Sequence, residues 1–246
     1  MSGHSKWSTI KHKKAALDAK RGKIFTKLIK EITVSVKENG SDPDSNPRLR
    51  LAVQNAKGSN MPKETIDRAI KKGAGDGAVY SEVTYEGHGT NGVAIFVECT
   101  TDNINRTVAN VRATFSKGGG NLGTNGSLEF LFDRKGIFIV AVPEGSDEDD
   151  LTLELIDGGA EDVEFNEGLM HISCQMDDFG LMQSKLEELN LVPESAELQR
   201  IPNSTLELDD EVFASNMKLI ESLEDDDDIQ NVYHNIEASE EQMASL

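Results

Sequence analysis

The side chains best suited to chemistry in this sequence lie in its first thirty residues, and that chemistry is electrostatic. The segment contains nine Lys or Arg residues and one acidic residue, Asp18. Lysine ammonium groups neutralise phosphates but lack the planar fork with which arginine recognises a base edge. Trp7 adds an aromatic face on which an unpaired base can stack. The candidate nucleic-acid-binding residues are Lys6, Trp7, Lys11, His12, Lys13, Lys14, Lys20, Arg21, Lys23, Lys27 and Lys30.

The remainder of the chain carries the opposite charge. Residues 1–80 contain 17 basic and 8 acidic side chains, whereas residues 81–246 contain 8 basic and 36 acidic ones, and the net charge is -19. Such asymmetry indicates that the basic end binds a polyanion, because the acidic part repels a phosphate backbone. The expected partner is nucleic acid, either DNA or ribosomal RNA. The alternative for the basic segment is a solvated face without a ligand.

Residue types that carry catalysis or bind metals are scattered along the sequence. The five histidines have no Cys or carboxylate at metal-ligand spacing, and Cys99 and Cys174 have no CxxC neighbour. The acidic runs at 148–150 and 224–228 lack the alternating ligands and glycine of a calcium loop, so we interpret them as solvated loops. We therefore expect no enzymatic activity, no catalytic residue, no metal and no cofactor.

A glycine-rich stretch at residues 118–123 formally matches the GxGxxG pattern of dinucleotide-binding loops. That pattern requires a strand before it and a helix after it, whereas here a helix precedes and a strand follows. We interpret the stretch as a flexible helix-to-strand loop. A loop that contacts phosphate, helped by Lys117, is the alternative.

The sequence favours a cytoplasmic location. Its N-terminus has no apolar h-region, and no stretch approaches the length of an apolar transmembrane helix. Two unpaired cysteines suit a reducing compartment. We expect no membrane contact.

Apolar periodicity predicts three amphipathic helices after a basic arm at 1–19. They are expected at 20–39, 47–56 and 62–73, and Asn46 and Pro47 supply an N-cap and first-turn proline for the second. Beyond residue 78 strands and helices alternate. Strands are expected at 79–86, 93–100, 128–132, 137–142, 163–165, 170–174, 196–201, 204–208 and 229–236, with helices at 103–117, 146–158, 178–190 and 211–224.

The order of these elements predicts an α+β multidomain fold. Residues 136–202 follow the order strand–helix–strand–strand–helix–strand, which is ferredoxin-like, and their joined flanks spell the same order. We therefore expect an N-terminal three-helix domain followed by two ferredoxin-like α/β domains, one inserted in the other. The predicted domains are residues 1–78, residues 79–134 with 203–246, and the insert at 135–202.

The sequence also resembles the YebC/PmpR family, which includes the mitochondrial translational activator of cytochrome c oxidase subunit I. The likeness rests on residues 3–14, 18–28, 60–63, 66–72, 85–87, 102–107 and 118–122, and it extends over essentially the whole chain. The resemblance implies three domains, no catalysis and no cofactor. It also implies one of two functions: transcriptional regulation by binding DNA, or ribosome association that eases synthesis of proline-rich stretches.

Three classes of function therefore compete. We predict a non-enzymatic regulator of gene expression that binds nucleic acid. The preferred prediction is a transcriptional regulator that binds DNA, and the alternative is a ribosome-associated translation factor. A protein–protein module would instead use the two acidic α/β domains. An enzyme would use a cleft between domains, but no clustered nucleophile and base supports it.

Overall fold

The computed structural model describes residues 18–75, 77 and 79–244, and these residues form two compact units. The first unit contains the described parts of 18–30, 77–133 and 202–244. The second contains residues 31–75 and 134–201. Each unit therefore joins segments that are distant in the sequence. The three predicted domain ranges remain a prediction.

The three predicted N-terminal helices are confirmed. They are α2 (Asp18–Asn39), α3 (Pro47–Gly58) and α4 (Lys63–Ala74). Asn46 caps α3 as expected, because its Oδ1 accepts from the backbone of Leu49 at 3.0 Å. Its amide nitrogen also donates to the carbonyls of Ser35 and Gly40, both at 2.8 Å. One side chain thus closes the end of α2 and the start of α3.

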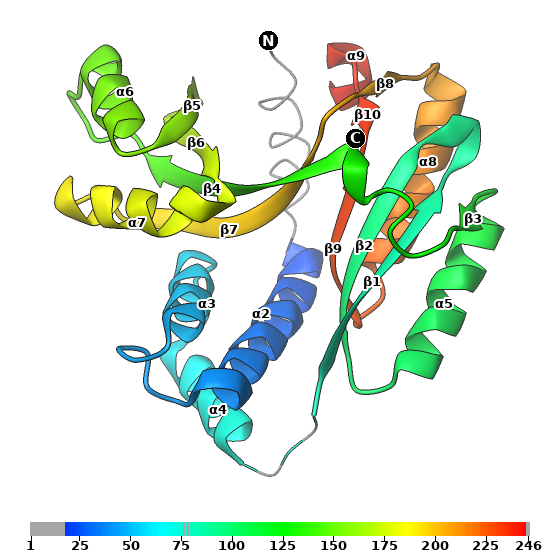
Figure 1. Cartoon of the computed structure of the whole chain (residues 1–246), viewed down its shortest axis with the longest axis horizontal. Coiled ribbons are helices and arrows are strands. Elements are labelled where there is room, and N and C mark those ends of the chain that lie inside the picture. The colour runs from blue at the N-terminus through cyan, green and yellow to red at the C-terminus, as the bar shows by residue number, and fades with distance from the viewer. Residues whose placement is uncertain (1–17, 76, 78, 245–246) are drawn as a thin grey trace. The chain divides into compact units, whose positions relative to one another are not determined.

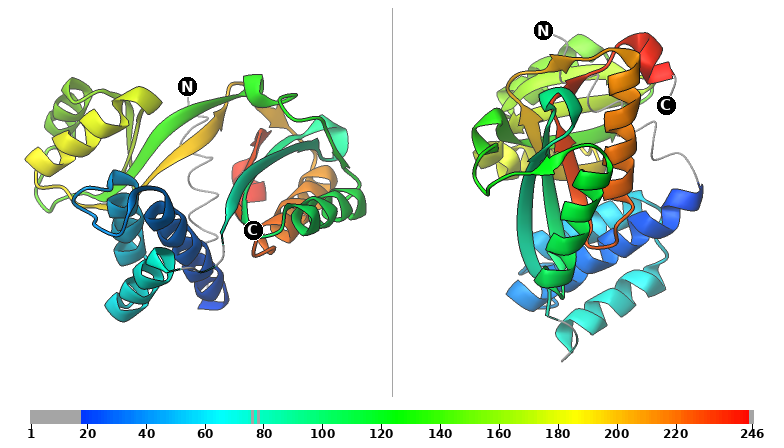
Figure 2. Two further views of the ribbon diagram at one scale, coloured as in Figure 1. Left: turned by 60° about the horizontal axis from the view of Figure 1, so that its bottom comes forward. Right: turned by 90° about the vertical axis from the view of Figure 1, so that its right-hand side faces the viewer.

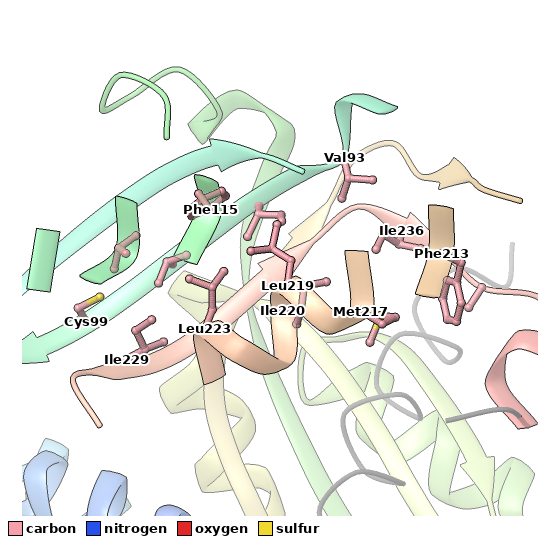
Figure 3. Close-up of a cluster of buried hydrophobic side chains, with 14 residues drawn as sticks. Val93, Cys99, Phe115, Phe213, Met217, Leu219, Ile220, Leu223, Ile229 and Ile236 are labelled. Carbon is pink, nitrogen blue, oxygen red and sulfur yellow. The ribbon is translucent and has the colours of Figure 1, made fainter. Parts of the chain in front are cut away.

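A four-stranded sheet forms the centre of the first unit (Figure 1). Its order is β3 (Asn121–Leu122), β1 (Ser81–His88), β2 (Ala94–Thr101) and β9 (Ile229–His234), and neighbouring strands are antiparallel. Helices α5 (Ile104–Lys117) and α8 (Asp210–Glu224) pack against one face of it. Figure 3 shows the resulting core, in which Phe115 of α5 and Leu219 and Leu223 of α8 are buried between helices and sheet.

Two predicted strands of this unit are wrong in detail. Residues 129–131 form the 3-10 turn η2 (Glu129–Leu131), not a strand, because Leu131 donates to the carbonyl of Leu128. The short strand β8 (Leu206–Glu207) pairs in parallel with β10 (Ile236–Glu237), outside the main sheet. Strand β1 takes the central place beside β2 instead. A short apolar run cannot by its periodicity reveal which of these structures it forms.

The second unit contains the predicted ferredoxin-like arrangement (Figure 2). Its elements are β4 (Phe132–Ala141), α6 (Glu148–Asp157), β5 (Ala160–Asn166), β6 (Leu169–Gln175), α7 (Phe179–Glu188) and β7 (Pro193–Pro202). The sheet order is β5-β6-β4-β7, with both helices against one face. Helix α6, expected from residue 146, begins at Glu148, and Asp147 caps it by accepting from the backbone nitrogens of Asp149 and Asp150.

Helix α3 is bound to the sheet of the same unit. The Asn55 amide donates to the carbonyl of Ala196 at 2.8 Å, and its oxygen accepts from the Ala196 nitrogen at 3.0 Å. Gly58 lies so close to the Glu194 carbonyl that a Cβ there would stand 1.9 Å from the oxygen. One face of α3 is therefore fixed against β7.

No helix in the described ranges combines the length and the apolar character needed to cross a membrane.

Candidate nucleic-acid interface

The predicted interface residues fall into three groups in the structure. Lys6, Trp7, Lys11, His12, Lys13 and Lys14 lie outside the described residues. Lys20 and Arg21 belong to α2, but their side chains also lie outside the described part. Lys23, Lys27 and Lys30 are described, and their i, i+4, i+7 spacing places them on one face of α2.

These three lysines contact the loop and strand that follow α8 in the first unit. Lys23 pairs with Asp225 at 2.6 Å, and both side chains are exposed, by 43% and 66%. Lys27 donates to the carbonyl of Gln230 at 3.2 Å. The ammonium groups expected to meet phosphates are therefore held by an acidic segment of the same chain.

Lys30 lies deeper than the other two. Its ammonium donates to the carbonyls of Thr100 (3.1 Å) and Asp227 (2.7 Å) and to Oδ1 of Asp228 (3.0 Å). It also lies 5.6 Å from the centre of the Tyr80 ring, within range of a cation–π interaction. Only 11% of the side chain is exposed. Lys30 thus acts as an anchor for α2 within the first unit.

Asp228 is the centre of a network that the sequence did not reveal. Beyond Lys30, its carboxylate accepts from Arg106 Nη2 at 2.6 Å and from the hydroxyls of Thr107 and Thr101 at 3.0 and 3.1 Å. The interpretation of 224–228 as a solvated loop is therefore wrong for Asp228, which is buried. The spacing of Asp102 and Arg106, which form an i, i+4 ion pair at 2.8 Å, was the one local signal.

The environment of Asp228 stabilises its charged form. Burial alone would raise its pKa, but hydrogen bonds from Arg106, Lys30 and Thr107 outweigh burial and lower the pKa to about 2. The carboxylate is thus ionised at neutral pH and neutralises two cations from distant segments. It fastens α2 and the first turn of α5 to the start of β9.

The glycine-rich stretch follows α5 but is not the predicted loop, because it contains the strand β3 (Asn121–Leu122), which pairs with β1, and its first part is closely packed. A Cβ on Gly120 would lie 2.4 Å from the His88 carbonyl oxygen, and one on Gly118 would lie 2.8 Å from Leu219. Buried Glu86 holds the exposed part that follows, because its carboxylate accepts from the backbone nitrogens of Gly126 and Leu128. These glycines allow close approach of α5, β1 and α8.

Both cysteines are buried, and burial raises the pKa of Cys99 to about 12 and that of Cys174 to about 11. Both thiols are therefore protonated at neutral pH, whereas the thiolate is the nucleophile and metal ligand. Among the residues that the structure describes, no three His, Cys, Asp or Glu side chains gather as a metal site would require.

Taken together, these features define a class: a multidomain α+β protein with N-terminal helices, antiparallel sheets and a basic N-terminal segment. Comparison with protein families matches two parts of the chain to domains of one family. Residues 5–76 match the TACO1/YebC protein N-terminal domain, and residues 80–236 match the TACO1/YebC second and third domain. The chain belongs to the TACO1/YebC family.

Relatives of known sequence extend over the whole chain. A protein of Amoebophilus asiaticus is 59% identical over 96% of this chain and 98% of its own length, and one of Geotalea uraniireducens is 51% identical over 100% of both. Each is named "probable transcriptional regulatory protein". The crystal structure of a conserved hypothetical protein from Aquifex aeolicus is similar with a TM-score of 0.81 and 43% identity, covering 91% of this chain and 93% of that one.

Proposed function

We propose that this protein is a non-enzymatic regulator of gene expression that binds DNA through its basic N-terminal segment. The names of its full-length relatives support the regulatory role. The observation that carries the proposal is the distribution of charge, with nine basic side chains and one acidic one in residues 1–30 of a chain of net charge -19. Binding to nucleic acid is dominated by such phosphate-neutralising cations.

The surroundings of the candidate side chains determine which of them can contact phosphate. Lys30 is neutralised by Asp228 and nearly buried, so it positions α2. Lys23 is exposed and paired with an exposed carboxylate, so a phosphate can exchange with Asp225 at little cost. Phosphate contact in this proposal is made chiefly by Lys6, Lys11, Lys13, Lys14, Lys20 and Arg21, with Trp7 and His12 among them, and Lys23 and Lys27 at its edge.

The first experiment removes two of these cations. Lys13→Ala with Lys14→Ala should weaken binding to a fluorescent DNA duplex and reduce the slope of log K against log salt by about one or two units. The matched control is Lys218→Ala with Arg112→Ala, two exposed cations on α8 and α5. Equal losses from the two pairs would contradict a localised N-terminal interface.

A second experiment separates DNA from RNA, because a lysine-rich segment also suits structured RNA. DNA binding is measured with ribosomal RNA as competitor, and sedimentation of the protein with ribosomes is followed in parallel. DNA binding that persists under competition supports the proposal. Loss of DNA binding together with co-sedimentation would replace it by the ribosome-associated translation factor.

A truncation lacking residues 1–19 tests the protein–protein alternative. The proposal predicts a large loss of nucleic-acid binding on truncation. If the acidic α/β parts were the working surface instead, the truncated protein would bind its partners undiminished.

A further inference from the structure

A second group of cations lies on helices α3 and α4 of the second unit. Residues 47–75 contain seven basic side chains and only two acidic ones, Glu64 and Asp67. Six of the seven are exposed. The α3–α4 basic surface consists of Arg50, Lys57, Lys63, Arg68, Lys71 and Lys72.

These six side chains have no bound acid, whereas six other described cations each pair with a carboxylate: Lys23, Lys30, Arg48, Arg106, Lys135 and Lys185. Arg48, the seventh, pairs with Glu31 and Glu38 at 2.8 Å each. None of the six, by contrast, forms an ion pair or a side-chain hydrogen bond with any residue that the structure describes. Their full charge therefore faces solvent, in a protein whose net charge is -19.

Helix stability accounts for some of these cations but not for all. Lys57, Lys71 and Lys72 lie in the last turns of their helices, where the helix dipole favours positive charge. Arg50 lies in the first turn of α3, which has no acidic residue, and Lys63 is the first residue of α4. A cation at a helix N-terminus costs about 0.3–1 kcal/mol. Arg50 and Lys63 therefore oppose the stability of the helices that carry them.

The side of α3 that bears Arg50 and Lys57 is the side that β7 leaves uncovered. The two residues are seven apart, so they share one helix face about 10 Å apart along the axis. Asn55, which binds Ala196 of β7, points to the opposite side of α3 by the helical period. Lys63 follows Lys57 after the short turn between the helices. The cations thus come from two consecutive helices and not from a single helix face.

We propose that the α3–α4 basic surface is a second binding surface, for the phosphate backbone of duplex DNA. Residues 47–75 contain no aromatic side chain, and base stacking on aromatic residues is a main source of affinity for single strands. Six unpaired cations on two helices without an aromatic side chain suit the phosphates of a duplex better than the bases of a single strand. This inference rests on the proposed function for its class of ligand, but it assigns residues beyond the N-terminal segment.

The test neutralises the two cations that oppose the helix dipole. Arg50→Gln with Lys63→Gln is compared with Arg112→Gln with Lys218→Gln, which removes the same two residue types from exposed helical positions of the first unit. Binding to a 20-base-pair DNA duplex and to one of its strands is measured from 50 to 200 mM salt. The Arg50/Lys63 pair should lower duplex affinity at least about fivefold beyond the control and reduce the salt slope by about one to two units.

Thermal unfolding separates binding from folding. Because both cations oppose the helix dipole, the Arg50/Lys63 variant should melt no lower than the parent protein. The charge-conserving variant Arg50→Lys with Lys63→Arg should bind as the parent does. Losses equal to those of the control pair, or a loss confined to the single strand, overturn the inference.

The two experiments distinguish failure of the α3–α4 basic surface from failure of the proposed function. If Lys13→Ala with Lys14→Ala weakens duplex binding while the Arg50/Lys63 variant matches its control, the second surface is wrong and the N-terminal interface stands. If neither pair weakens binding more than the control, the proposed function is wrong as well.

Discussion

The lysines of α2 and the cations of α3 and α4 have similar chemistry and opposite surroundings. Lys23, Lys27 and Lys30 of α2 are each held by the 225–230 segment of the first unit. The α3–α4 basic surface has no carboxylate within ion-pairing distance among the described residues. The difference teaches that the number of basic residues in a segment does not measure the positive charge available to a ligand.

Burial explains why the α2 set is paired. A charge removed from water must be matched by an opposite charge and by hydrogen bonds, or its desolvation destabilises the fold. Lys30 meets this requirement through Asp228 and two carbonyl oxygens. The exposed α3–α4 cations are hydrated and need no such partner. The paired α2 lysines, Lys23, Lys27 and Lys30 (the paired set), should thus govern stability. The α3–α4 basic surface (the free set) should govern binding.

The largest expected effect is on stability, at the centre of the paired set. Asp228→Asn should lower the free energy of unfolding by roughly 3–5 kcal/mol, because it leaves Lys30 and Arg106 without a buried counter-charge. Urea unfolding followed by circular dichroism measures the change. Asp227→Asn, at an exposed neighbouring side chain, is the control and should shift stability by less than about 0.5 kcal/mol.

The same carboxylate predicts a dependence on pH. Its pKa is about 2 in the folded protein against an ordinary value of 3.8, so the folded state favours the ionised form. The stability it contributes is complete above about pH 4 and is lost as the pH falls through about 2. The difference between the parent protein and Asp228→Asn should shrink over that interval. A constant difference down to pH 2 would contradict the assigned pKa shift.

The next largest effect is expected on stability at Lys30, and it tests whether this lysine anchors α2 or binds phosphate. Lys30→Met should lower the free energy of unfolding by about 2 kcal/mol, because three acceptors lose a charged donor. It should leave the salt slope of DNA binding unchanged, because Asp228 already neutralises this ammonium. A slope that falls by one unit would show that Lys30 meets a phosphate after all.

A smaller effect on stability is expected at the exposed ion pair between Lys23 and Asp225. Asp225→Asn should change stability by less than about 1 kcal/mol, since both side chains of the Lys23–Asp225 pair are largely exposed. Freed from its partner, Lys23 should raise DNA affinity by up to about fivefold. Asp149→Asn removes one acid from α6 without releasing a cation and should raise affinity less. Equal gains in affinity from the two variants would show that net charge, and not the release of Lys23, causes the effect.

The smallest effect concerns stability in the free set. Lys72→Ala should change the free energy of unfolding by at most about 0.5 kcal/mol, because only the helix dipole stabilises this exposed cation. Thermal unfolding at low and high salt measures it. A larger loss would mean that Lys72 has a structural partner and does not belong to the free set.

Local signals in the sequence predicted most of the helices and strands correctly. Asn46 and Pro47 placed the start of α3, and the apolar periodicity placed α2 and α5 within a few residues. The prediction failed at 128–132, where Leu128 is buried and donates to Glu86, more than forty residues earlier in the sequence. A contact of that span leaves no trace in local periodicity.

The sequence by itself determined the order of the elements, the ferredoxin-like insert and the separation of positive from negative charge, because these follow from patterns within a few residues and from composition. Tertiary structure alone decided which cations are neutralised. Lys30, Arg106 and Asp228 come from three distant segments, and only folding brings the two cations within 3.0 Å of the Asp228 carboxylate. Charge is encoded residue by residue, but its availability depends on neighbours that the fold supplies.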